Sequence, residues 1–172
     1  NMLKLSKVKI QIGLLGRSKC GMVVQLSYVT FPQVRFHNIM NDESDDIQVD
    51  KTKALLRRRA RQGLPASFGI DIVDLGPGYL TASMDLAEHH LATNGYLHAG
   101  AIVTLADTSC GFGCFANLPD GARNFTTVEL KSNFLRSTTN GTLFSRATLV
   151  HAGRRTQVWD ATVFDDSDKT LA

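Results

Sequence analysis

The chain has 172 residues, of which 43% are hydrophobic and 20% are charged, as expected for one soluble globular domain with a sizeable core. Its net charge of +3 comes from residues 1–41, which hold six Lys or Arg and no Asp or Glu, while the rest is net acidic. This distribution argues against a nucleic-acid-binding surface. The sequence contains no run of about 18 uncharged apolar residues, so no membrane span is predicted.

Residues 1–41 contain short apolar patches without a clear period, and they lack the pattern of a signal peptide. A different, acidic composition begins after Met40. We therefore expect residues 1–41 to be a disordered extension or upstream read-through, with the natural start near Met40. Residues 42–172 are the expected domain.

The three cysteines, Cys20, Cys110 and Cys114, are too few for a disulfide framework. Cys110 and Cys114 lie four residues apart on an expected helix. We expect them to be buried free thiols in a reducing compartment, which predicts a cytoplasmic protein.

The first expected element is a helix over Lys51–Gln62, capped by Asp50. Its basic face is interpreted as solvated surface, with a phosphate-contacting edge as the alternative; it is formed by Arg57, Arg58, Arg59 and Arg61. A hairpin follows, with alternating strands over Phe68–Leu75 and Tyr79–Leu86.

A long apolar helix is predicted over Ala101–Leu118. Gly111 and Gly113 within it each cost about 1 kcal/mol relative to alanine, which indicates close approach by something packed around the helix. Three antiparallel strands are then expected over Asn124–Leu135, Thr142–His151 and Thr156–Phe164. This order predicts an α+β fold with one helix against an antiparallel sheet, and its uncovered edges predict self-association.

The start of the long helix is the candidate reactive site. Its first backbone N–H groups, near Ala99–Ala101, have no partner within the helix and can polarise a carbonyl. Asn94 and His98 precede them, and Asp107 lies about 13 Å further along the axis. Asp107 therefore cannot reach that carbonyl within one chain, whereas Asp107 of a two-fold partner can.

Each of these residues also has a structural interpretation. His98 can simply bond to backbone, Asn94-Gly95 can be only a turn, and Asp107 can bond to Thr104 or to a neighbouring chain. A serine hydrolase is disfavoured because Ser109 lacks the glycines of a nucleophile elbow. No metal site is expected, since the spacing matches no ligand pattern for His89, His90, His98, Cys110 and Cys114.

Four sequence segments resemble the hotdog-fold acyl-CoA thioesterases of the PaaI-like and 4-hydroxybenzoyl-CoA type. The resemblance extends from about Leu55 to Ala172. The segments are Asn94-Gly95-x-x-His98-Ala99-Gly100, Leu105-Ala106-Asp107-Thr108, Val128-x-Leu130-Lys131-x-Asn133-Phe134-Leu135-Arg136 and Gly153-Arg154.

The resemblance implies hydrolysis of acyl-CoA thioesters, with an aromatic or medium-chain acyl group, to free acid and CoA without metal or cofactor. It implies that Asn94 and His98 position the thioester and water, and that the Ala99 N–H polarises the carbonyl. Asp107 of the partner subunit would be nucleophile or general base. Paired chains would form each active site, and dimers commonly form tetramers. The candidate contacts to CoA phosphates are Arg136, Arg154 and Arg155.

The chain departs from the family pattern at two points. Ala99-Gly100 replaces the usual Gly-Gly after the histidine, which keeps the N–H group if no positive φ is needed there. The family also has one more inner strand after the turn at Asp165–Asp168, so we expect a truncated sheet with unpaired backbone. The alternative function is a non-catalytic acyl-CoA-binding hotdog module; a hotdog dehydratase or isomerase is a further possibility.

Overall fold

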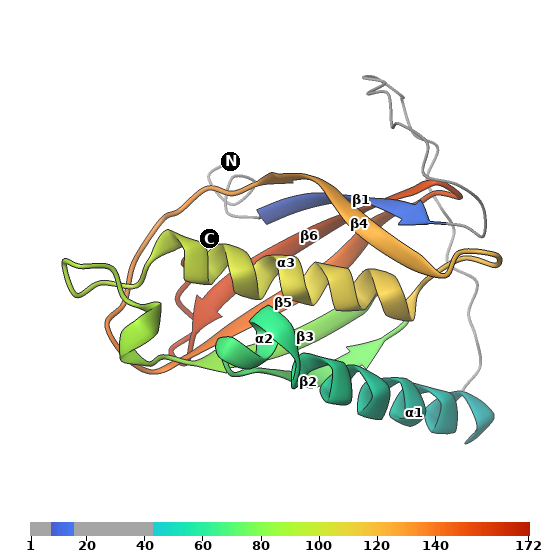
Figure 1. Cartoon of the computed structure of the whole chain (residues 1–172), viewed down its shortest axis with the longest axis horizontal. Coiled ribbons are helices and arrows are strands. Elements are labelled where there is room, and N and C mark those ends of the chain that lie inside the picture. The colour runs from blue at the N-terminus through green and yellow to red at the C-terminus, as the bar shows by residue number, and fades with distance from the viewer. Residues whose placement is uncertain (1–7, 16–42) are drawn as a thin grey trace.

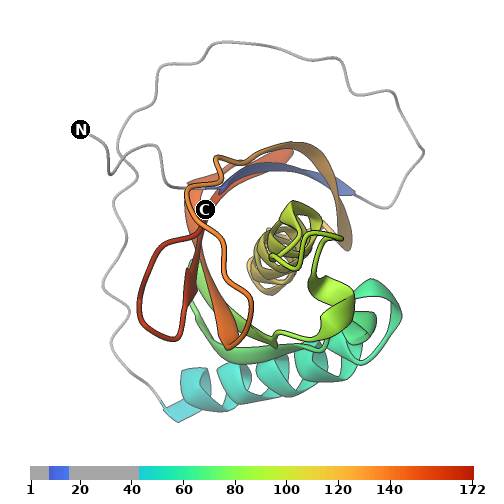
Figure 2. The same ribbon diagram turned by 90° about the vertical axis from the view of Figure 1, so that its left-hand side faces the viewer.

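One long helix, α3 (Ala99–Ala116), lies inside a curved six-stranded sheet (Figure 2). The structure is a computed structural model that describes residues 8–15 and 43–172. The sheet order is β2-β3-β5-β6-β1-β4, and every neighbouring pair is antiparallel. This arrangement confirms the predicted α+β fold with an antiparallel sheet around a central helix.

The predicted strands are present with small changes at their ends (Figure 1). They are β2 (Ile70–Gly76), β3 (Tyr79–Asp85), β4 (Asn124–Lys131), β5 (Thr142–Ala152) and β6 (Thr156–Asp165). β4 ends four residues before the predicted Leu135. The reason is that the backbone N–H of Leu135 donates to the carbonyl of Leu171 instead of continuing the β4 ladder.

Helix α3 is buried along a stripe of small and apolar residues, which includes Leu105, Cys110 and Cys114. Both of its inner glycines are explained by aromatic neighbours. A Cβ atom at Gly111 would lie 2.9 Å from the Phe125 ring, and one at Gly113 would lie 2.8 Å from the Trp159 ring. Among the described helices, α3 is the one long and apolar enough to cross a membrane, and half of it is buried inside this fold.

Helix α1 (Glu43–Ala60) starts well before the predicted Lys51, so Asp50 lies inside the helix and does not cap it. Leu56 and Ala60 are buried, whereas Ala54 is exposed. A short helix, α2 (Gly63–Ser67), lies between α1 and β2, where no element was predicted, and the 3-10 helix η2 (Glu88–His90) precedes the loop into α3.

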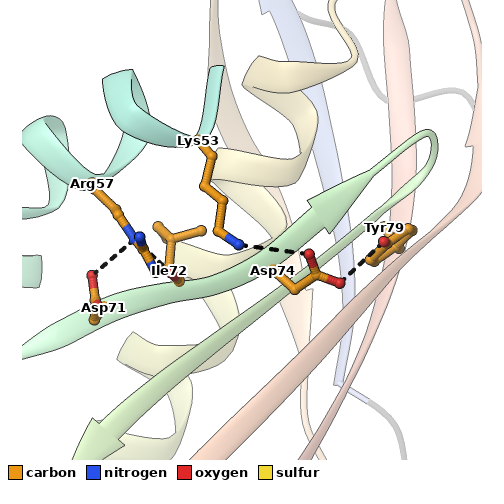
Figure 3. Close-up of polar contacts among 6 residues, drawn as sticks. All are labelled: Lys53, Arg57, Asp71, Ile72, Asp74 and Tyr79. Carbon is orange, nitrogen blue, oxygen red and sulfur yellow. Dashed lines mark hydrogen bonds and ion pairs between the residues drawn. The ribbon is translucent and has the colours of Figure 1, made fainter. Parts of the chain in front are cut away.

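Polar contacts hold α1 on the edge strand β2 (Figure 3). Arg57 Nε donates to the carbonyl of Ile72 at 2.9 Å and lies 3.8 Å from Asp71. Lys53 lies 3.7 Å from Asp74, which also accepts from the Tyr79 hydroxyl at 3.1 Å.

A second arginine of α1 is also used inside the fold, because the Arg59 guanidinium lies 4.0 Å from the centre of the Phe115 ring. For Arg57 and Arg59, these contacts favour a packing role over a phosphate-contacting edge. Arg58 and Arg61 are exposed, as the interpretation of a solvated face predicts.

Strand β1 (Val8–Leu15) corrects the expected domain boundary. Residues 1–41 were set apart as an extension, but residues 8–15 form an inner strand between β6 and β4. Val8, Ile10 and Ile12 are fully buried. The unpaired backbone expected beside β6 is therefore not found, because β1 pairs with it there. The expected start at Met40 and the expected free thiol of Cys20 lie outside the described residues.

Candidate active site

The loop before α3 is a tight, hydrogen-bonded turn. Leu91 and Leu97 form an isolated bridge, and Gly95 at its tip has a φ of 82°. The Asn94 side-chain oxygen accepts from the N–H of Tyr96 at 3.2 Å. The interpretation of Asn94-Gly95 as a turn is thus confirmed. The side-chain oxygen of Asn94 is used within the turn, so the NH₂ group is the part of this side chain that can contact a substrate.

His98 caps the first turn of α3. Its Nδ1 accepts from the N–H of Gly100 at 2.8 Å, and its carbonyl accepts from the N–H of Ala101 at 2.9 Å. Because Nδ1 is the acceptor, the neutral ring carries its proton on Nε2. A Cβ at Gly100 would lie 2.8 Å from Nδ1, so this position requires a glycine for the ring to stay in place.

Ala99 provides the first amide of α3 that is open to a ligand. The N–H groups of Gly100 and Ala101 are used by His98, whereas the contacts found among the described residues give Ala99 N–H no acceptor. Ala99 is exposed and helical, and among the described non-glycine residues only Asp168 has a positive φ. Alanine in place of the family's usual glycine therefore causes no backbone strain here.

Asp107 is half-buried, and its Oδ1 accepts from the Thr127 hydroxyl of β4 at 2.9 Å. The alternative prediction of a hydrogen bond from Thr104 to Asp107 is wrong, because the Thr104 hydroxyl donates to the carbonyl of Gly100 at 2.8 Å. Thr127 was missed by the sequence analysis. A single threonine in an alternating strand carries no signal until the strand is laid against the helix.

The loop is anchored by a buried histidine that the sequence did not single out for this purpose. His90 Nδ1 accepts from the N–H of Ala87 at 3.0 Å, and the His90 carbonyl accepts from the N–H of His98 at 3.0 Å. Its ring stacks on Phe68 with 5.1 Å between ring centres. Burial, and then the neighbouring His89, lower the pKa of His90, so the ring is held neutral.

The thiol groups of Cys110 and Cys114 and the hydroxyl of Ser109 are buried inside α3. Cys110 and Cys114 are free thiols, as predicted. Burial raises the pKa of Cys114 to about 12, and burial together with Asp107 raises that of Cys110 well above its ordinary value. Both stay protonated at neutral pH and are poor nucleophiles. The buried Ser109 hydroxyl donates to the carbonyl of Leu105 at 2.6 Å. In the described ranges, no group of three metal-ligating side chains can hold a metal ion.

The three candidate CoA-binding arginines do not lie together. Arg136 Nη1 donates to the carbonyl of Thr170 at 3.2 Å, at the end of the sheet where Leu97 N–H donates to the Thr138 carbonyl. Arg154 and Arg155 lie exposed in the turn between β5 and β6. The ten residues of β6 separate these ends by about 30 Å. Only Arg136 is near the His98 loop of its own chain.

Comparisons with known proteins agree with this arrangement. Residues 94–172 match the thioesterase superfamily. The chain is 30% identical to the 1,4-dihydroxy-2-naphthoyl-CoA hydrolase of Listeria monocytogenes, with 63% of this chain and 88% of that protein covered. It is 28% identical to the acyl-coenzyme A thioesterase PaaI of Escherichia coli, with 62% and 74% covered.

A solved structure extends the similarity to three dimensions. A mutant thioesterase from Pseudomonas aeruginosa superimposes with a TM-score of 0.65 at 27% identity, covering 69% of this chain and 86% of that one. The matched family region begins at the turn of Asn94 and includes α3 with Asp107. The chain therefore belongs to the thioesterase superfamily and is a thioester-hydrolysing enzyme with the hotdog fold.

Proposed function

We propose that this chain hydrolyses acyl-CoA thioesters with an aromatic or medium-chain acyl group to free acid and CoA. The observation that supports this most directly is the open Ala99 N–H at the start of α3. Such an amide, at the positive end of a helix, stabilises the negative charge that develops on a thioester oxygen under attack.

The reaction needs one further group, a carboxylate that attacks or activates water. We assign it to Asp107 of the partner subunit, because Asp107 of the same chain is about 13 Å from the α3 start. Asp107 either attacks the carbonyl carbon or takes a proton from the attacking water. If Asp107 attacks, the tetrahedral intermediate expels the CoA thiolate and leaves an acyl–Asp107 anhydride, which water then hydrolyses to the acid and the free carboxylate. If Asp107 takes a proton from water, the intermediate formed by that water expels the CoA thiolate and leaves the acid directly, and the sulfur receives the proton that Asp107 holds. His98 and the Asn94 amide group orient the thioester and water.

A two-fold dimer is supported by the exposure of β4. This strand is at the edge of the sheet, and most of its residues are exposed, Thr127 among them. Strand edges of this kind pair with a second copy when no other element covers them. We therefore place the Asp107–Thr127 pair near a homodimer interface, with a dimer of dimers as the larger assembly.

We assign the residues that contact the CoA phosphates and the acyl group by their positions in the fold. Arg136, beside the His98 loop, is our first candidate for CoA phosphates; Arg154 and Arg155 would serve a CoA bound at the other end of the sheet. The acyl group would contact aromatic side chains such as Phe112, Phe115 and Phe134. No metal or cofactor is part of this proposal. The two buried free thiols support a reducing, cytoplasmic location.

The test is release of free thiol from phenylacetyl-, hydroxybenzoyl- and hexanoyl-CoA by wild type and by Asp107→Asn. We expect Asp107→Asn to lower the rate by about 10²-fold or more, the scale of losing a positioned acid–base group. Asp120→Asn makes the same chemical change at an exposed position beyond α3, and it should retain full activity.

The second candidate function is a non-catalytic acyl-CoA-binding hotdog module. It would be favoured if no ester releases thiol from the wild-type protein while CoA esters still bind tightly. Conversion of a hydroxyacyl or enoyl thioester without release of thiol would instead indicate a dehydratase or isomerase.

A further inference from the structure

We propose that β1 is a donor strand: residues 43–172 leave a strand-wide gap between β6 and β4, and residues 8–15 of the same chain fill it as a detachable piece. The inference concerns how this fold is completed, and its consequence for Asp107 rests on the function proposed above.

The gap follows from the pairing of the strands. Ile10 pairs with Trp159 of β6 on one side and with Leu130 of β4 on the other. Neighbouring strands lie 4.7–4.9 Å apart, so β6 and β4 are about 10 Å apart, too far for main-chain hydrogen bonds. In the part of the chain that the structure describes, β4 pairs with no strand except β1. β1 is therefore what joins β4 to the sheet.

The position of β1 is shared with the last residues of the chain. Leu171 N–H donates to the Val163 carbonyl at 2.8 Å, Val163 N–H donates to the Ala172 carbonyl at 2.9 Å, and both Leu171 and Ala172 are buried. Val8 pairs with Ala161, which lies two residues before Val163 in β6. β1 therefore follows Leu171 and Ala172 along the same edge of β6. The strand position beside β6 is thus built from residues 171–172 and residues 8–15, which are distant in sequence. The hydrogen bonds to β6 at this position therefore do not require one continuous segment of chain.

The segment fits the gap through an alternating pattern. Val8, Ile10 and Ile12 are fully buried, with Ile10 beside Trp159 on the side that faces α3. Lys9 points outward, with its side chain 60% exposed and its ammonium 3.9 Å from Asp160. Recognition by strand addition has two features. Main-chain hydrogen bonds supply affinity, and alternate side chains supply specificity.

The added strand also bears on the proposed catalytic carboxylate. Ile12 pairs with Thr127, directly after the bulge at Gln11–Ile12, and Thr127 donates to Asp107. Loss of β1 would leave β4 without a strand partner among the described residues, and Asp107 would lose the neighbour that fixes its side chain. Residues 8–15 are therefore a positioning element for Asp107.

The test uses the full chain with a protease recognition site introduced between residues 16 and 42. Trp159, the single tryptophan of the chain, reports whether β1 is in place. After cleavage, we expect the N-terminal fragment to co-elute with the body, and the tryptophan emission to stay that of a buried ring. Ile10→Asp should lose the fragment, shift the emission to longer wavelength and speed hydrogen exchange of β4 amides. Lys9→Gln, which lowers the net charge equally, should behave as wild type.

A labelled peptide of residues 8–15 gives a second measurement that does not depend on folding of the Ile10→Asp chain. It should exchange into the cleaved wild-type protein, and its Ile10→Asp version should bind at least about tenfold more weakly, because a charge would be buried. Release of the fragment with unchanged Trp159 emission and unchanged β4 protection would overturn the proposal. These readouts are independent of hydrolysis, so an inactive enzyme with the expected emission and exchange would contradict only the proposed function.

Discussion

At the scale of single residues, the site depends on which polar groups are already bonded within the chain. His98 accepts from the N–H of Gly100, while the preceding N–H of Ala99 has no acceptor among the described residues. Asp107 is held by Thr127 from a different element, twenty residues later in the chain. The Thr127 hydroxyl therefore orients the carboxylate, and the other oxygen of Asp107 can face the thioester or water.

We predict that Thr127→Val lowers the rate of thioester hydrolysis by about 10- to 100-fold, because a hydrogen bond to a charged group contributes about 1.5–3 kcal/mol and each 1.4 kcal/mol is a factor of ten. The shape of the side chain is kept, so thermal unfolding should shift little. Thr126→Val on the same strand is the matched control and should retain full activity. Equal rates for the two variants, measured by thiol release, would show that the Thr127 contact does not position Asp107.

At the scale of elements, α3 packs closely against the sheet because two of its residues, Gly111 and Gly113, have no side chain. Trp159 of β6 occupies the space beside Gly113, and Phe125 of β4 occupies the space beside Gly111. The Trp159 indole N–H donates to Gln157 at 2.8 Å, and Gln157 in turn donates to the Asn117 carbonyl at the end of α3. The ring is therefore fixed and cannot move aside for a larger residue.

Gly113→Ala should destabilise the protein by about 1–3 kcal/mol through overpacking, although alanine favours a helix by about 1 kcal/mol over glycine. The measurement is urea unfolding followed by the emission of Trp159. Thr108→Ala, at a half-exposed position of α3, is the control for changing this helix and should have a small effect. A stabilised Gly113→Ala protein would mean that the Trp159 ring has room to shift.

At the scale of the whole molecule, the proposed reaction needs two copies of the chain. The α3 start and Asp107 of one copy are too far apart, and β4 beside Asp107 lies at an exposed sheet edge. An active site shared between subunits has a consequence that single variants cannot test. Two different inactive chains can build one intact site when they pair.

Mixing His98→Ala with Asp107→Asn, after dissociation and reassembly, should restore about one quarter of wild-type activity. Half of the dimers would be mixed, and each mixed dimer would have one site with both native residues. Neither variant alone should regain activity under the same treatment. No recovery from a mixture shown to contain mixed dimers would place His98 and Asp107 in the same site of one chain, or outside the reaction.

Much of the fold was predictable from local sequence pattern. The hairpin of β2 and β3, the apolar stripe of α3 and the strands β5 and β6 each have a regular hydrophobic period, which depends on neighbours along the chain. The two cysteines of α3 were likewise recognisable as buried thiols. Ends of elements were less predictable: α1 starts early, and β4 stops where Leu135 bonds to Leu171 instead.

From the sequence we could predict a long helix close behind His98 with a carboxylate inside it, and we could offer a turn as one interpretation of Asn94-Gly95, because these features depend on residues close together in the chain. The helix starts at Ala99, two residues before the predicted Ala101. Three features became visible in the folded chain alone: Thr127 holds Asp107, Arg136 is separated from Arg154 and Arg155, and residues 8–15 lie inside the sheet. Their short alternation became meaningful only beside β6 and β4, since a strand is stabilised by partners that its own sequence does not contain.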